Sequence, residues 1–201
     1  MMKIFALLVS MSVVMTGGCS TTKLPPTNAY TISIATIKDK PVEQTTSNKI
    51  IRVGMPTSTA AIMSRNILYQ DRHHSLNAYA FSKWSDTPNR MLANLFLTSI
   101  GDSAIFKVAL PADSRGKSDY ILESSLQQFH QRINADDTST ASVRIGFYLI
   151  ETKTGVVKDA REFMSTEEVT SINANGGVEA LNRAALSINA KLLEWLASLK
   201  L

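Results

Sequence analysis

Three histidines are the side chains of this sequence with the clearest potential for metal binding or proton transfer. His73 and His74 are neighbours, so on an extended segment their side chains would point to opposite faces and could not share a metal ion. His130 lies far away in the sequence, and no cysteine or His-x-x-x-His spacing accompanies it. We therefore predict that the protein has no metal site and no cofactor.

Two pairs of adjacent carboxylates favour structural roles over catalysis. Asp136 and Asp137 lie among Asn, Thr and Ser residues, which is typical of a solvated turn. Glu167 and Glu168 are interpreted as an exposed charged pair in a loop. The sequence also lacks a Gly-x-Ser-x-Gly elbow, a phosphate-binding loop and a dinucleotide fingerprint. These observations disfavour an enzyme, and a hydrolase is the last of the functions that we consider.

The first eighteen residues have the properties of an export signal. Lys3 makes the N-terminus positive, and residues 4–15 are almost wholly apolar. About a dozen apolar residues are too few to cross a hydrocarbon core of about 30 Å, which requires about 20 residues in a helix. Residues 1–18 are therefore predicted to be a cleaved signal peptide rather than a membrane-spanning anchor.

The only cysteine, Cys19, follows Gly17 and Gly18, and this arrangement resembles the lipobox of bacterial lipoproteins. The resemblance implies that Cys19 becomes the N-terminal residue and carries three acyl chains, palmitate among them, which would anchor the protein in a membrane. The alternative is an ordinary signal peptide followed by an unpaired thiol. Ser20 after the cysteine implies, in bacteria of the enteric type, delivery to the outer membrane with the protein facing the periplasm.

Removal of residues 1–18 leaves 183 residues, enough for one domain with its own hydrophobic core. The formal charge falls from +4 to +3, because Lys3 is the only charge lost. This mild and scattered charge predicts no nucleic-acid binding. We expect a lipidated tether over residues 19–28, which contains Pro25 and Pro26, and then a single domain over residues 29–201.

Alternating apolar residues predict several strands in the domain. These strands are expected at residues 30–34, 50–53, 65–70, 77–84, 104–110, 120–132, 141–149 and 156–164. A hairpin loop over residues 152–155 joins the last two strands. We expect loops over residues 38–48 and 165–177, and a short helical turn over residues 57–63.

Two helices complete the predicted fold. The first begins at Thr87-Pro88, with threonine as the cap and proline at the first helical position, and ends at Gly101. The second spans residues 178–199, with apolar residues at steps of three and four, and places Trp195 in the core. Because it has only three heptads, packing across the sheet is preferred to a coiled coil. We predict an α+β fold, a mixed, mostly antiparallel sheet with two main helices packed on one face.

Several segments of the chain resemble the ABC-type transport auxiliary lipoproteins, a family that includes the paraquat-inducible protein C type. After the lipobox, the resemblance lies in Tyr30-Thr31-Ile32, Ile51-Arg52-Val53-Gly54-Met55-Pro56, residues 63–69, residues 83–88, Asp119-Tyr120-Ile121-Leu122, Leu126, Phe129 and the terminal amphipathic helix. It implies that Pro56 shapes a turn and that Arg65 pairs with a carboxylate. For Trp84 two interpretations stay open, namely core packing and contact with a partner.

The resemblance implies a non-enzymatic docking component of an intermembrane lipid transport system in the outer membrane. Its partners would be an inner-membrane ABC or related complex and an MCE-domain protein that spans the periplasm, and a ring of identical subunits is left open. Two other functions also stay open. One is a periplasmic lipid-binding carrier with an apolar pocket, and the other is an envelope assembly or structural lipoprotein with no role in transport.

Overall fold

The computed structural model describes residues 25–33, 47–199 and 201. None of the helices in these ranges is both long enough and apolar enough to cross a membrane. In chain order the elements are β1 (Asn28–Tyr30), β2 (Ser47–Val53), β3 (Thr57–Ser58), β4 (Asn66–Gln70), β5 (Leu76–Trp84), α2 (Pro88–Asp102), β6 (Phe106–Pro111), β7 (Tyr120–Ile133), β8 (Ser139–Glu151), β9 (Val157–Glu168) and α3 (Ala174–Ser198).

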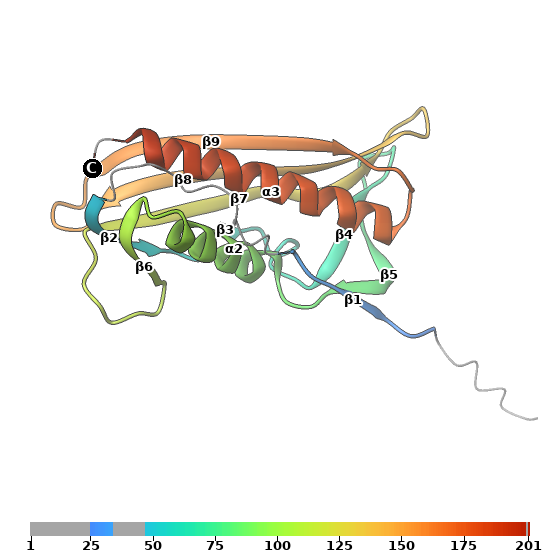
Figure 1. The fold of residues 1–201 in the computed structure, drawn as a ribbon. Coiled ribbons are helices and arrows are strands. Elements are labelled where there is room, and N and C mark those ends of the chain that lie inside the picture. The colour runs from blue at the N-terminus through green and yellow to red at the C-terminus, as the bar shows by residue number, and fades with distance from the viewer. Residues whose placement is uncertain (1–24, 34–46, 200) are drawn as a thin grey trace, which may run out of the picture.

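The nine strands of the described chain form one mixed sheet around β7 (Figure 1). One side of β7 pairs antiparallel with β8 over its whole length, and β8 pairs antiparallel with β9. The other side of β7 pairs in parallel with three short strands in succession, β2, β3 and β4. β6 extends the sheet beyond β2, while β5 and then β1 extend it beyond β4. The predicted α+β class with a mixed, mostly antiparallel sheet is confirmed.

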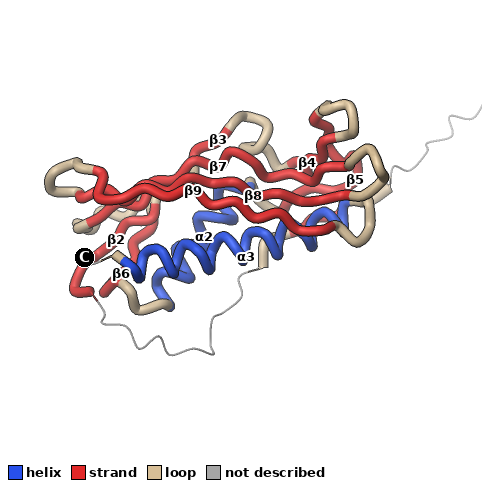
Figure 2. The backbone as a smooth tube through the Cα atoms, turned by 90° about the horizontal axis from the view of Figure 1, so that it is seen from above, coloured by secondary structure: helices blue, strands red, loops and turns tan. Residues whose placement is uncertain are grey.

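Both helices cover the same face of this sheet (Figure 2). α3 lies along β8 and β9, and α2 lies beside β6 and against α3. The alternation in β8 explains which face is covered, because Val143, Ile145, Phe147 and Leu149 are fully buried while the residues between them face away. The predicted period of two is therefore confirmed.

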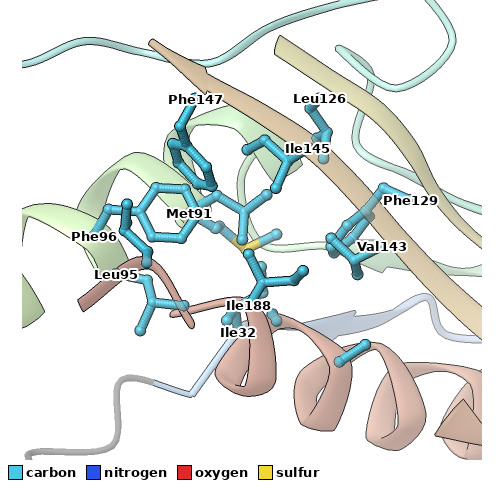
Figure 3. Close-up of a cluster of buried hydrophobic side chains, with 14 of the residues drawn as sticks. Ile32, Met91, Leu95, Phe96, Leu126, Phe129, Val143, Ile145, Phe147 and Ile188 are labelled. Atoms are coloured by element: carbon cyan, nitrogen blue, oxygen red, sulfur yellow. The ribbon is translucent and has the colours of Figure 1, made fainter. Parts of the chain in front are cut away.

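The core between the sheet and the helices is aromatic at one end. The ring centroids of Phe96 on α2 and Phe147 on β8 lie 5.3 Å apart in an edge-on arrangement. Trp195 of α3 is buried against Phe147, with 6.4 Å between centroids, which confirms its predicted place in the core. Figure 3 shows how Ile188 of α3 continues this cluster between the helices and the sheet.

Two predicted boundaries are wrong in the first part of the domain. The expected helical turn over residues 57–63 begins later, because Thr57 and Ser58 form β3 and pair with β7. The turn itself is present, since the Met63 amide donates to the Thr59 carbonyl at 3.0 Å. The expected strand at 30–34 is β1 at Asn28–Tyr30, and its predicted last residue, 34, lies outside the described residues, as does most of the predicted loop at 38–48.

The sequence predicted that the first helix ends at Gly101, but the structure shows a later end. α2 continues to Asp102, and the Ser103 amide donates to the Ser99 carbonyl at 3.0 Å. The residue that reverses the chain is Ala104, with a φ of 56°. Left-handed backbone of this kind is where a helix usually places glycine, so the sequence signal pointed three residues too early. The start is as predicted, with Thr87 at the cap position and Pro88 in the first turn.

The predicted loop at 165–177 is also wrong, because β9 runs to Glu168 and α3 begins at Ala174. The Asn173 side chain caps α3 by accepting the Gly176 amide at 3.0 Å. A Cβ added to Gly176 would collide with the Ser171 backbone carbonyl. Gly176, which lies in the predicted loop, therefore allows the close approach of a capped helix to the segment before it.

Two helical glycines give opposite expectations for the same substitution. Gly176→Ala is expected to lower the free energy of unfolding by about 1–3 kcal/mol, because the new methyl group meets backbone atoms of Ser171. Gly101→Ala is expected to raise it by about 1 kcal/mol, because no atom lies within 4 Å of the added Cβ and alanine favours the helix. Urea unfolding followed by circular dichroism measures both, and equal shifts of one sign would contradict the described start of α3.

Candidate functional site

The three histidines lie in two different parts of the fold, a turn and a strand. His73 and His74 belong to the exposed turn between β4 and β5, and the Nδ1 atom of His74 lies 3.4 Å from Nη2 of Arg132. His130 lies on β7, where burial and then the charge of Arg132 lower its pKa. Within the described ranges, no group of three or more His, Cys, Asp or Glu side chains is arranged to hold a metal ion.

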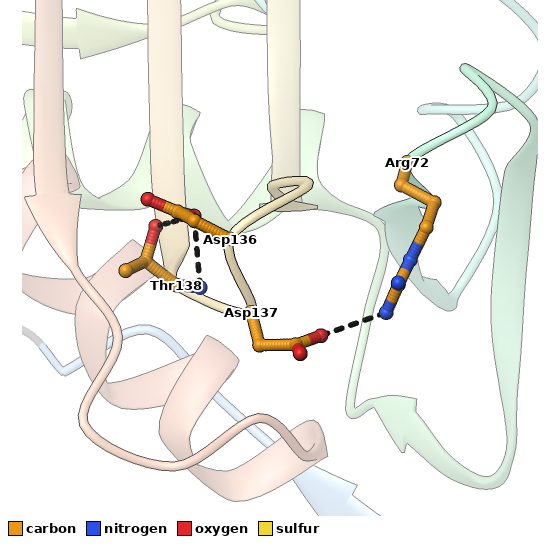
Figure 4. A network of polar contacts seen from close by, with 4 residues as sticks. All are labelled: Arg72, Asp136, Asp137 and Thr138. Atoms are coloured by element: carbon orange, nitrogen blue, oxygen red, sulfur yellow. Dashed lines mark hydrogen bonds and ion pairs between the residues drawn. The ribbon is translucent and has the colours of Figure 1, made fainter.

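The carboxylates of Asp136 and Asp137 stabilise two neighbouring turns (Figure 4). Asp136 accepts hydrogen bonds from the Thr138 hydroxyl at 2.6 Å and the Thr138 amide at 3.1 Å, and these bonds lower the pKa of Asp136. Asp137, with a φ of 59°, pairs with Arg72 at 2.7 Å and so links the β7–β8 turn to the β4–β5 turn. Both carboxylates are exposed, so the predicted solvated turn is confirmed.

The second pair, Glu167 and Glu168, lies in β9 and not in a loop as predicted. The strand continues because its pairing with β8 extends to Thr140. Arg183 of α3 binds both glutamates, with 3.6 Å between its Nε atom and the Glu167 carboxylate and a 2.6 Å hydrogen bond from Nη2 to the Glu168 carbonyl. This arginine therefore satisfies part of the open edge of β9.

Pro56 and Arg65 both have structural roles. The buried Pro56 carbonyl accepts a hydrogen bond from the side chain of Asn89, which fixes the turn between β2 and β3 to α2. Arg65 pairs with no carboxylate among the described residues, so that expectation is corrected. Its Nε atom donates instead to the Trp84 carbonyl at 2.9 Å, next to an irregularity in the β4–β5 register that leaves this carbonyl available.

Trp84 lies in the core. Its side chain is 1% exposed, and its ring centroid is 5.5 Å from that of Phe129 on β7. Of the two interpretations of this residue, core packing is the one that the structure shows. The Trp84 side chain offers no accessible surface to a partner in this conformation.

Cys19 lies outside the described residues, but the segment that follows the tether is fixed to the domain. β1 pairs with β5, and Ile32 is 4% exposed and points into the core beside Met91 and Ile188 (Figure 3). Asn182 of α3 accepts the Ser33 amide at 2.7 Å and donates to the Thr31 carbonyl at 3.3 Å. The chain upstream of Asn28 therefore continues into a segment that is paired with β5 and packed into the core.

The face of the sheet that the helices leave uncovered, here called the outer face, carries the exposed Tyr148 of β8. Tyr148 is 41% exposed, and its hydroxyl would lie 3.6 Å from a Cβ on Gly146, so the ring lies over this glycine. On the same face, Arg144 and Glu162 form an ion pair at 2.6 Å, and the hydrogen bond from Arg144 lowers the pKa of Glu162. Met164, which is 50% exposed, is paired with Arg144 across the ladder.

Two shallow hollows flank Tyr148 on this face. One of about 350 Å³ is lined by residues that include Met55, Thr57 and Ser125, and the other of about 170 Å³ includes Ala160. Sequence reasoning did not single out Tyr148. A signal was present, because a tyrosine stands in the series of residues 142, 144, 146 and 148, whose other members are small or polar.

Solved structures show the same architecture. Protein XCC0632 from Xanthomonas campestris has 18% identity and a TM-score of 0.74, with 85% of this chain and 94% of that chain covered. An uncharacterised protein of known structure has 13% identity and a TM-score of 0.66, with 86% of this chain and 99% of that chain covered. At these identities the likeness shows the fold alone. No curated protein matches the chain significantly.

The family comparison goes further than the fold. Residues 30–192 match the family described as the ABC-type transport auxiliary lipoprotein component. The chain belongs to this family. The resemblance noted in the sequence is thereby confirmed, and the matched region begins within β1 and ends within α3.

The docking of the N-terminal segment on α3 can be tested with one isoleucine substitution. Ile32→Ala is expected to lower the free energy of unfolding by about 2–4 kcal/mol and to speed hydrogen exchange at the Ser33 amide, because the buried side chain holds this segment in the core. The matched control is Ile172→Ala, at a position that is 45% exposed, with an expected change within about 1 kcal/mol. Similar losses in both variants would contradict the described position of residues 28–33.

Proposed function

We propose that this protein is a non-catalytic docking subunit of an intermembrane lipid transport system, anchored in the outer membrane by lipid on Cys19 and facing the periplasm. The observation that carries the proposal is the match of residues 30–192 to a family of auxiliary lipoproteins in ABC-type transport. The sequence around Cys19 supports the anchor, and Ser20 supports the outer membrane as its destination.

The path of the chain between anchor and domain supports a docking role. The nine residues from Cys19 to Thr27 span at most about 30 Å when fully extended. From Asn28 onward the chain is paired with β5 and then packed into the core through Ile32. The domain therefore stays close to its membrane, and a transport partner has to extend to it across the periplasm.

The partner in this proposal is an MCE-domain protein that spans the periplasm, and the outer face is its proposed contact. Aromatic residues, methionine and arginine are enriched at protein interfaces, and this face presents Tyr148, Met164 and Arg144. A homo-oligomer of the subunit is compatible with this arrangement, since the helices occupy the opposite layer.

A carrier with an internal acyl-chain pocket is less well supported. Phe96, Phe147 and Ile188 fill the space between the sheet and the helices, and each is at most 1% exposed. The hollows considered above are open surface features with polar as well as apolar residues. An envelope structural lipoprotein differs from the docking subunit only in its partner, so the two are separated by the partner recovered from cells.

A photo-crosslinking amino acid in place of Tyr148 tests this contact in intact cells. We expect capture of an MCE-domain protein, because Tyr148 is exposed on the outer face. The matched control carries the crosslinker at Glu194, an exposed position on α3, and is expected to capture far less. Recovery of cell-wall or unrelated envelope proteins would contradict the transport role, and recovery of lipid alone would favour the carrier.

Cys19→Ala tests the anchor separately. The variant is expected to incorporate no labelled palmitate and to disappear from the outer-membrane fraction, because it lacks the only cysteine, whose modification the lipid anchor requires. The adjacent Ser20→Ala variant is expected to keep the label, as its cysteine is intact. An outer-membrane fraction that retains the Cys19→Ala protein would disprove the lipid anchor.

A further inference from the structure

A groove of about 540 Å³ opens at the end of the sheet where β7 begins. It is formed by segments that are distant in sequence. Lys49 comes from β2, Lys117 from the segment between β6 and β7, and Lys153 from the hairpin between β8 and β9. Pairing of β2 with the first residues of β7, and of β7 with the last residues of β8, brings these three lysines to one site.

The groove has an excess of positive charge. Its lining contains the three lysines and Arg52 as cations, against Asp119 and Glu151 as anions, which leaves a formal charge of +2. The ammonium groups of the lysines make no ion pair with any other described residue. Their charges are therefore available to a ligand.

The remaining charged groups of the lining are partly occupied by the fold. Arg52 donates from both terminal nitrogens to the carbonyls of Ser114 and Gly116, which holds the loop after β6 in place. Asp119 accepts the Ile50 amide at 2.8 Å. Glu151, in turn, accepts a hydrogen bond at 2.6 Å from a threonine hydroxyl of the hairpin. The carboxylates thus support the walls of the groove and neutralise it only in part.

A hydroxyl group adds a second polar element. Ser118 lines the groove, and its Oγ atom is buried without a hydrogen-bond partner among the described residues. Buried hydroxyl groups are normally paired, so this one has a hydrogen-bonding capacity that the described fold leaves unused beneath the surface of the groove. The lysine ammonium groups are the suitable donors to phosphate oxygens.

Apolar surface adjoins the charged lining. Ile121 contributes to the groove itself. Val156, in the same β8–β9 connection as Lys153, and Val157, the first residue of β9, are 61% and 51% exposed. Cations next to apolar surface match an amphiphile, whose charged headgroup meets the lysines while its first carbons contact the apolar side chains.

We propose that this groove binds the phosphate headgroup of an anionic glycerophospholipid. The inference rests on the proposed lipid transport function for the identity of the ligand, and on the groove for its chemistry. The family description names neither a ligand nor a binding site, so this assignment goes beyond it.

The position of the groove indicates from which side the ligand comes. β2 pairs with Tyr120 at one end of β7 and β4 pairs with Gln131 at the other, eleven residues away, which corresponds to about 37 Å along the strand. β1 joins the sheet beyond β4 and β5 (Figure 1). The groove is therefore remote from the end at which the anchored chain enters, and it meets a lipid presented from the periplasm.

Calorimetric titration of the full-length gene product, purified in the form that the cell produces, tests the site. The probes are dihexanoyl phosphatidylglycerol below its micellar concentration and, separately, inorganic phosphate. The Lys49→Gln/Lys117→Gln/Lys153→Gln variant is expected to bind the lipid about tenfold more weakly, as three partly screened charges are lost. The matched control, Lys83→Gln/Lys107→Gln/Lys158→Gln, removes three exposed lysines outside the groove and is expected to keep the affinity.

Several results would overturn the proposal. Equal losses in both triple variants would show a general charge effect, and equal affinities of all three proteins would show that the groove is not the site. Inorganic phosphate binding as tightly as the lipid would assign the groove to free phosphate. If the groove variant bound lipid normally but lost capture of the MCE-domain protein through position 148, the lysines would serve the partner. Weaker lipid binding by the groove variant, with unchanged capture of the MCE-domain protein, would support the proposal. Failure of all three proteins to capture the MCE-domain protein would contradict the proposed function and would not by itself contradict lipid binding in the groove.

Discussion

The need to pair both edges of β7 is the constraint on which the rest of this structure depends. Buried backbone amides and carbonyls require hydrogen-bond partners, and β7 is 14 residues long. β8 satisfies one edge continuously, whereas the other edge is shared by β2, β3 and β4. Because of this pairing, Thr57 and Ser58 form a strand in a segment for which the sequence predicted a helical turn. The length of β7 also sets the distance between β1 and the groove.

The sequence predicted the parts of the fold that local patterns determine. The alternation of β8 and the apolar spacing of α3 are properties of contiguous residues, so their type and their buried faces could be read directly. Gly176 lies in helix where a loop was predicted, because the sequence does not reveal that this residue approaches the Ser171 backbone. The same holds for Arg65, because the sequence indicates a cation but not that the fold offers it the Trp84 carbonyl.

The candidate sites divide in the same way. The lipobox at Cys19 and the family resemblance are patterns of contiguous residues, and Tyr148 continues a local alternation. The groove could not be predicted, since Lys49, Lys117 and Lys153 are separated by 68 and 36 positions and meet only through the pairing of β2, β7 and β8. Non-local pairing thus created this groove.

The arrangement also constrains how such a subunit acts. Ile32 and Asn182 hold residues 28–33 to α3, and α3 packs along β8 and β9, so this N-terminal segment and the far groove belong to one packed body. A packed core deforms little, because its side chains interdigitate at close to crystal density. The outer face and the groove are therefore surfaces that the packed domain already presents. A partner of the kind proposed would bind to them without a rearrangement of the core.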